Sequence, residues 1–341
     1  MASSKTSISA RSLVLASCVL IPCLFAACPK DNVPVKPRVG VSTAKPAPTK
    51  PIPTVAPVFS ADRAMQHVRQ QLDFGPRPPD TIALEKTRNY IISELKSYGL
   101  RVSTDEFTAK TPLGDKRMAN IVGDFPGETK DIVAVASHYD TKFYDDMRFV
   151  GANDPAASVA TLLEIARVLG NSKEKPKLTY RVVFFDGEEA LCEGWDECSK
   201  PEAPDNTYGS RRYVSQLKAQ GDLKSTRALI LLDMMGYTKL ELGRDPSSTR
   251  WLQDIIWQAG RELGHSKVFV DRQEGVGGDD HEPFLDAGIP AVDMIQLSGY
   301  PYWHKADDDF DKISADSIKI VGDTVLASLP RIVSYVQANG G

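Results

Sequence analysis

The sequence lacks three features that define large protein classes: a long apolar run, an excess of one charge, and an internal repeat. The 341 residues carry a formal net charge of −4 with acids and bases interspersed, so no basic surface for nucleic acid is expected. The apolar stretch at residues 13–25 is shorter than the roughly 20 residues that a membrane-spanning helix needs. These absences argue against a nucleic-acid-binding protein, a membrane-spanning protein and a repeat protein.

Cysteine is also scarce, with five residues in the chain. Cys18 and Cys23 lie in an N-terminal segment typical of a secretion signal, which has a charged start, an apolar middle and small residues at its end. Cys28 closes this segment, and residues 24–28 (Leu-Phe-Ala-Ala-Cys) resemble the bacterial lipobox, whose cysteine is lipidated. We therefore expect residues 1–28 to be a signal segment of lipoprotein type, with plain secretion as the alternative. Either one places the protein in the periplasm or at the cell surface.

Proline is concentrated just after this segment, at eight positions within residues 29–57. Such composition favours extended polyproline II structure, so we expect a flexible tether, with a tail of no function as the alternative. Residues 58–341 are expected to form one catalytic domain, since α/β folds routinely reach this size. The only membrane contact expected is a lipid anchor at Cys28. A monomer is expected, because no exposed apolar stripe is evident outside the core-facing helices.

The two remaining cysteines, Cys192 and Cys198, are six residues apart. In an exported protein this spacing suggests a local disulfide that closes the loop between them. A pair of zinc ligands is the alternative, but the spacing is wide for a zinc knuckle and its partners are missing.

Short apolar runs alternate with amphipathic segments through the expected domain. The expected strands are residues 131–137, 178–185, 228–232, 267–270 and 291–295. The expected helices are residues 82–98, 156–169, 208–218, 251–263 and 315–338. This alternation predicts an α/β fold with a mostly parallel, doubly wound mixed sheet and helices on both faces.

Five residues of metal-ligand type lie at or near the ends of expected strands: His138, Asp154, Glu189, Asp233 and His304. Ligands of open α/β sheets bind at the carboxyl ends of the strands, so these side chains are expected to meet there. Zinc accepts imidazole nitrogen and carboxylate oxygen, and its catalytic sites keep one position open. Each residue alone would more often be structural, but the five together predict a zinc enzyme.

Glu188 and Glu189 are neighbours leaving a strand, so their side chains should point to opposite sides. One can then bind metal while the other transfers protons. Asp140, two residues after His138, is expected to orient that histidine.

Several other polar residues are expected to lie outside the site. His67 and His265 fall on or at the end of amphipathic helices and are interpreted as surface or capping residues. Asp307, Asp308 and Asp309 are interpreted as a solvated acidic turn rather than a metal site.

From Phe74 to the C-terminus these motifs resemble the zinc aminopeptidase superfamily, and more closely its animal-type glutaminyl cyclase branch. Four features favour the cyclases over the aminopeptidases. They are Trp303 directly before His304, the stretch Gly278-Asp279-Asp280-His281-Glu282-Pro283-Phe284, the Trp195-bearing loop that ends in Tyr208-Gly209-Ser210-Arg211, and the pair Tyr300-Pro301. Two features depart from the cyclase pattern: Ser137 and Val159 stand where animal cyclases carry a cysteine pair, and Asp293 stands in place of a histidine, which leaves part of the proton network open.

The resemblance implies a zinc-dependent glutaminyl-peptide cyclotransferase, an acyltransferase that converts the N-terminal glutamine of peptides or proteins to pyroglutamate and releases ammonia. It also implies a role for each site residue. One zinc per chain is held by Asp154, Glu189 and His304; Glu188 shuttles the proton; Asp279 and Asp233 hold the amine; and Trp303, Trp195 and Tyr300 line the substrate pocket.

Two other functions stay open. In a di-zinc aminopeptidase, His138 and Asp233 would complete a second metal site, Asp154 would bridge two zincs, and Glu188 would activate water. A non-catalytic binding domain on the same fold is the other alternative, although such domains usually lose ligands or base and none is missing here.

Overall fold

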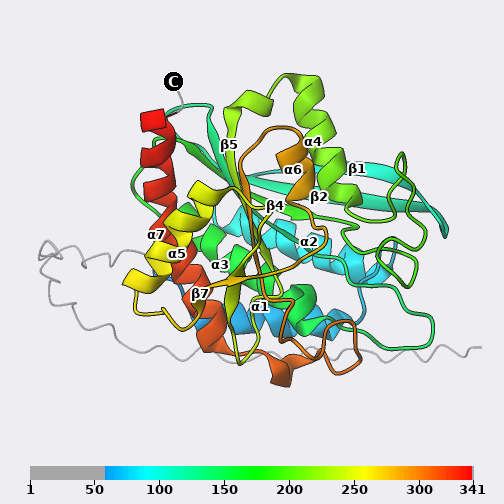
Figure 1. Cartoon of the computed structure of the whole chain (residues 1–341). Coiled ribbons are helices and arrows are strands. Elements are labelled where there is room, and N and C mark those ends of the chain that lie inside the picture. The colour runs from blue at the N-terminus through cyan, green and yellow to red at the C-terminus, as the bar shows by residue number, and fades with distance from the viewer. Residues whose placement is uncertain (1–57, 340–341) are drawn as a thin grey trace, which may run out of the picture. The chain divides into compact units, whose positions relative to one another are not determined.

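A six-stranded sheet forms within residues 58–339, the part of the chain that the computed structural model describes (Figure 1). The strands in chain order are β1 (Arg101–Thr111), β2 (Gly114–Phe125), β3 (Ile132–His138), β4 (Thr179–Phe185), β5 (Thr226–Asp233) and β8 (Ala291–Ile295). They lie side by side in the order β1-β2-β4-β3-β5-β8. Pairing is parallel among β4, β3, β5 and β8, and antiparallel between β1 and β2 and between β2 and β4. The mostly parallel mixed sheet that the sequence predicts is therefore confirmed.

Helices cover both faces of the sheet, as Figure 1 shows. They are α1 (Ala61–Phe74), α2 (Ile82–Ser97), α3 (Ser158–Gly170), α4 (Tyr208–Gln220), α5 (Arg250–Glu262), α6 (Glu282–Asp286) and α7 (Ala315–Asn339). Shorter turns of helix are η1 (Ala152–Ala157), η2 (Leu223–Ser225) and η3 (Phe310–Lys312). Successive strand residues point to opposite faces, so β3 sends Val133 and Val135 into one core and Ala134 and Ala136 into the other. The doubly wound arrangement follows from this alternation.

The larger core lies against α1, α2, α3, α5 and α7, and the smaller one against α4 and α6. Side-chain caps begin two of these helices: the hydroxyl of Ser60 accepts from the amide of Arg63, and the hydroxyl of Thr81 from that of Leu84. The helix expected at residues 82–98 ends, as predicted, before Gly99, which has a positive φ of 81°. No described helix has the length and apolar character needed to cross a bilayer.

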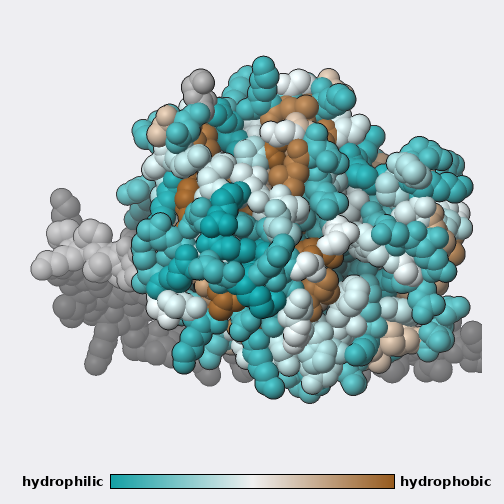
Figure 2. Space-filling model, viewed as in Figure 1, coloured by the Kyte–Doolittle hydropathy of each residue, from teal (hydrophilic) through white to brown (hydrophobic). Residues whose placement is uncertain are grey.

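The β1–β2 hairpin, the strand β6 (Leu242–Arg244) and the short helix α6 were not expected from the sequence, whereas the amphipathic helix expected around His67 forms as α1. The strand expected at residues 267–270 forms as β7 (Phe269–Gln273), but it pairs with β6 in a separate two-stranded sheet. The predicted signal segment (residues 1–28), the lipidation site at Cys28 and the tether (residues 29–57) lie outside the described residues. On the face drawn in Figure 2, hydrophobic residues form small separate groups among hydrophilic ones.

Candidate active site

The five expected metal ligands meet at the carboxyl end of the parallel strands. His138 ends β3, Asp233 ends β5, and Glu189 follows β4 by four residues. Asp154 lies in η1, and His304 lies on the loop between β8 and α7. A cavity of about 280 Å³ opens over this point, and its lining includes Asp154, Glu189, Asp233 and His304 together with Glu188 and Asp279. Parallel pairing of β3 with β5 thus brings together His138 and Asp233, which are 95 positions apart in the sequence.

Asp154, Glu189 and His304 form what we term the cavity cluster. Nε2 of His304 lies 3.1 Å from Oε1 of Glu189 and 3.5 Å from Oδ2 of Asp154. The second oxygen of Glu189 is buried and has no hydrogen-bond partner among the described residues. Two carboxylates and one imidazole, with a ligand atom of each within 4.8 Å of the others, suit a divalent metal ion such as zinc. Burial opposes the charged form of His304, but the nearby carboxylates of Glu189 and Asp154 outweigh it and raise its pKa.

His138, Asp154 and Asp233 form a second group, which we term the buried cluster. Nε2 of His138 lies 3.2 Å from Oδ1 of Asp154 and 3.1 Å from Oδ1 of Asp233. Asp154 thus belongs to both clusters and turns one oxygen toward each histidine. All three side chains are buried, and His138 does not line the cavity. This cluster also has ligand atoms within 4.8 Å of one another.

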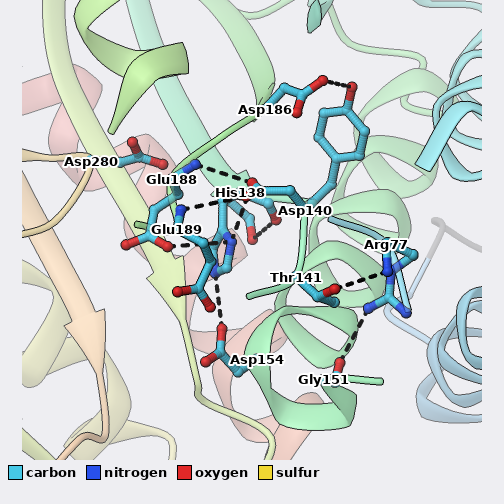
Figure 3. Close-up of polar contacts among 12 residues, drawn as sticks. Arg77, His138, Asp140, Thr141, Gly151, Asp154, Asp186, Glu188, Glu189 and Asp280 are labelled. Atoms are coloured by element: carbon cyan, nitrogen blue, oxygen red, sulfur yellow. Dashed lines mark hydrogen bonds and ion pairs between the residues drawn. The ribbon is translucent and has the colours of Figure 1, made fainter. Parts of the chain in front are cut away.

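Glu188 and Glu189 diverge as the sequence predicts. Figure 3 shows both backbone amides directed at Asp140, whose two carboxylate oxygens accept from them at 3.1 and 3.4 Å. The carboxylate of Glu188 lies 3.6 Å from Nδ1 of His138. Burial raises the pKa of Glu188 well above its ordinary range, although the charge of His138 opposes that shift. Oδ1 of Asp140 also lies 3.7 Å from Nδ1 of His138. Asp140 therefore contacts the histidine as well as the backbone of the two glutamates.

The turn before Asp154 depends on glycine. Gly151 has a φ of 56°, and a Cβ there would come within 1.8 Å of the carbonyl oxygen of Asp154. The buried guanidinium of Arg77 donates to the Gly151 carbonyl at 3.3 Å (Figure 3). Burial lowers the pKa of Arg77 to about 10, although the charges of Asp308, Asp140 and Asp154 oppose that shift.

Two tryptophans line the cavity, as expected. Trp303 is 41% exposed and stacks on the ring of His304, with centroids 4.4 Å apart. Trp195 lies on the loop that the Cys192–Cys198 disulfide closes, so the disulfide expected from the sequence is confirmed. Lys142 was not predicted from the sequence. Its side chain is buried, and its Nζ donates to the carbonyls of Ala190 and Cys192 at 2.7 Å each and so holds the start of this loop.

Tyr300 is positioned differently from the sequence-based expectation. It is 4% exposed and is not among the residues that line the cavity. Its hydroxyl donates to Oδ1 of Asp308 at 2.6 Å. The structure therefore places Tyr300 off the cavity lining, and its contact with substrate stays a prediction.

An acidic group forms another part of the site. Asp279 lines the cavity, and Asp280, His281 and Asp293 lie buried behind it. Burial and the nearby Asp233 carboxylate raise the pKa of Asp279 to about 7. Burial and the charge of Asp279 likewise raise the pKa of Asp293, which lies 4.0 Å from His281.

Two interpretations of polar residues are wrong. His67 is not on the surface: it is 4% exposed and contacts the hydroxyls of Tyr90 and Tyr98, which α2 brings across α1. Asp308 is not part of a solvated turn: it is fully buried, while Asp307 and Asp309 on either side are exposed. In both cases the partners lie too far along the sequence for a local pattern to reveal them.

Comparison with known proteins adds to this geometry. Residues 120–329 match the model of peptidase family M28. A glutaminyl-peptide cyclotransferase from Bos taurus is 32% identical over 248 residues, covering 64% of this chain and 67% of the bovine protein. The crystal structure of a glutaminyl cyclase from an Acidobacteriales bacterium superposes with a TM-score of 0.75 at 33% identity, covering 85% of this chain and 100% of that one. A glutaminyl cyclase from Porphyromonas gingivalis superposes with a TM-score of 0.74 at 29% identity, covering 81% and 99%.

Proposed function

This chain belongs to peptidase family M28, within its glutaminyl cyclase branch, and on that premise we propose how its residues carry out the reaction. The enzyme is a glutaminyl-peptide cyclotransferase that acts on peptides with an N-terminal glutamine. The α-amine of that glutamine forms a bond to its own γ-carbonyl carbon, the bond from that carbon to the amide nitrogen breaks, and ammonia leaves. No water is consumed, because the nucleophile belongs to the substrate.

Asp154, Glu189 and His304 would hold one zinc ion per chain. The two carboxylates offset the charge of the ion, and this cluster borders the cavity in which a substrate oxygen has access. Bound zinc acts as a Lewis acid on a carbonyl oxygen. Asp140 supports the arrangement, because it fixes the backbone of Glu188 and Glu189 and so directs one side chain to the cluster and the other to the substrate.

Glu188 is the proton carrier. Its carboxylate lines the cavity beside the cavity cluster and is not one of that cluster's members. It takes the proton that the α-amine loses on forming the new bond, and it returns a proton to the departing amide nitrogen. One buried carboxyl group can perform both transfers, because the donor and the acceptor are nitrogens of the same residue. General acid–base catalysis of this kind typically accelerates a reaction by about 10²- to 10⁴-fold.

The walls of the cavity select and orient the glutamine. Trp195, Trp303, Val276, Ile295 and Leu297 give it apolar surface that excludes water. Asp279 and Asp233 line the same cavity with carboxyl groups, which hold the α-amine in line with the γ-carbonyl carbon.

The di-zinc aminopeptidase alternative rests on one observation, the position of Asp154 between the two histidines. In our proposal the buried cluster holds no catalytic metal, because His138, its imidazole donor, does not line the cavity. The similarity to glutaminyl cyclases in both sequence and structure supports the cyclase over the aminopeptidase.

The observation that carries the proposal is the position of Glu188. This residue lines the cavity beside three metal-ligand side chains and is not itself a member of their cluster. The test is mass spectrometry of the products formed from the peptides Gln-Phe-Ala and Leu-Phe-Ala. Loss of ammonia from the first peptide, with the second unchanged, is the expected result. Release of free leucine or glutamine would make the enzyme an aminopeptidase.

We also propose that the protein is exported and anchored to a bacterial membrane through a lipid on Cys28, with residues 29–57 as tether. It would then meet its peptide substrates outside the cytoplasm, as a monomer. Metabolic labelling with a radioactive fatty acid tests the anchor: the wild-type chain should incorporate label and Cys28→Ser should not. Label retained by the variant would exclude Cys28 as the site.

A further inference from the structure

Asp308 lies four residues after His304, in the loop that leads to η3. Its side chain is fully buried between the exposed residues Asp307 and Asp309. A carboxylate is costly to bury unless polar partners replace its hydration. The partners of Asp308 therefore indicate what it does.

Asp308 accepts the backbone amides of three consecutive residues at the start of η1. Its carbonyl oxygen accepts from Ala152 at 3.2 Å, Oδ1 from Asn153 at 2.8 Å, and Oδ2 from Asp154 at 3.1 Å. The hydroxyl of Tyr300 gives Oδ1 a second donor at 2.6 Å. Both carboxylate oxygens thus accept hydrogen bonds, and Oδ2 accepts from the amide of Asp154, the residue that belongs to both clusters.

The contacts of Asn153 extend this link to a third segment. Its Nδ2 donates to the carbonyl of Met234 at 3.1 Å, and its Oδ1 accepts from the amide of Gly236 at 2.7 Å. Met234 directly follows Asp233 and has a φ of 45°. Asp308 and Asn153 together therefore connect the segments that carry His304, Asp154 and Asp233.

Asp140 provides an internal parallel. It follows His138 by two residues and accepts the amides of Glu188 and Glu189, just as Asp308 follows His304 by four and accepts those of Asn153 and Asp154. Each acidic member of the cavity cluster thus has its backbone amide bound by a buried aspartate. A carboxylate suits this role, because each of its two oxygens can accept from one amide, whereas an asparagine would direct its own N–H₂ at one of them.

From these contacts we propose that Asp308 is a positioning residue that sets the Asp154 carboxylate against His304 and thereby determines the affinity of the cavity cluster for its metal ion. The inference rests on the proposed metal-binding role of Asp154. It concerns a residue that does not line the cavity.

The test measures zinc affinity on the full chain by competition with a chelator. Asp308→Asn should weaken binding by roughly 10- to 100-fold, the usual effect of losing a partner that orients a ligand. Asp307→Asn and Asp309→Asn make the same chemical change at the exposed neighbours and should bind zinc as the wild type does. The visible absorption of the cobalt-substituted protein, which reports ligand geometry, should change only in Asp308→Asn.

A merely structural role predicts a different pattern: a lower melting temperature of the metal-free protein, with zinc affinity and cobalt spectrum unchanged. That pattern would overturn the inference. If Asp308→Asn does not fold, Tyr300→Phe takes its place, because it removes a single hydrogen bond to Asp308. It should weaken zinc binding several-fold, and wild-type affinity in this variant would likewise overturn the inference.

Asp154→Ala separates this inference from the proposed function. Loss of zinc in Asp154→Ala with retention in Asp308→Asn leaves the metal site standing and removes the positioning role. Wild-type zinc binding in Asp154→Ala overturns both.

Discussion

The cavity cluster and the buried cluster contain the same donors, two carboxylates and one imidazole, and they share Asp154. They differ in access. His304 stacks against a partly exposed tryptophan at the cavity, whereas His138 is 1% exposed and lies among Asp140, Asp154, Glu188 and Asp233. Donor chemistry alone therefore does not locate the reaction in this protein. A ligand set becomes catalytic where substrate can reach all its donors, and a set of the same composition whose imidazole lies away from the cavity can serve as support.

The largest expected effect tests that contrast directly. His304→Ala should lose bound zinc and lower kcat/KM by about 10⁴ or more, because it removes a ligand at the open cluster. His138→Ala should keep zinc, because His138 contacts Asp154 but is not itself one of the three donors of the cavity cluster. Elemental analysis of the purified variants, together with ammonia release from Gln-Phe-Ala, measures both effects. Zinc lost from His138→Ala and kept by His304→Ala would reverse the roles of the two clusters.

A smaller loss is expected when the proton carrier is removed and the ligands stay. Glu188→Gln keeps the size of the side chain, so zinc should stay bound while kcat falls by roughly 10² to 10⁴. KM should change little, because the amide fills the same space. Turnover at the wild-type rate would show that the proton is carried by another group.

Substitution of the cavity wall should affect binding more than chemistry. Trp303→Ala removes the apolar surface beside His304 and should raise KM by about tenfold, equivalent to roughly 1.4 kcal/mol. Trp303→Phe keeps an aromatic ring and should retain most of the affinity. Steady-state kinetics with Gln-Phe-Ala compares the two, and an unchanged KM in both would place the substrate elsewhere in the cavity.

The smallest expected effect lies in the helical layer, at His67. Burial lowers the pKa of His67 in the folded protein, although Glu94 and Glu164 oppose that shift. The unfolded chain then binds more protons below the ordinary histidine pKa of about 6.5, so stability falls as pH drops through that value toward the folded pKa. His67→Gln should reduce this loss of unfolding free energy between about pH 7 and about pH 5, by about 1.4 kcal/mol per unit of pKa difference. Urea unfolding of both proteins at the two pH values measures it, and equal losses would contradict the assignment.

Much of the architecture follows from local sequence. The apolar runs that became β3, β4, β5 and β8 are too short for buried helices, and the amphipathic segments between them require crossovers. Once the sheet is parallel, the convergence of His138, Glu189 and Asp233 is a geometric consequence.

The parts that could not be predicted depend on long-range partners. In the β1–β2 hairpin, polar and exposed residues run along β1, so no core-facing alternation marks this strand in the sequence. His67 and Asp308 are polar residues whose burial is offset by groups on other elements, and Tyr300 turns to Asp308 rather than to the cavity. The position of each of these side chains is determined by tertiary packing and not by the local sequence pattern.

The central claim is that the cavity cluster alone carries the catalytic metal. Titration of zinc into the metal-depleted full chain, with ammonia release from Gln-Phe-Ala as the readout, tests it most directly. The account predicts that activity rises linearly and stops at one zinc per chain, with Asp154, Glu189 and His304 as ligands. Activity that appears only as a second equivalent binds would contradict it and would assign the buried cluster a metal of its own.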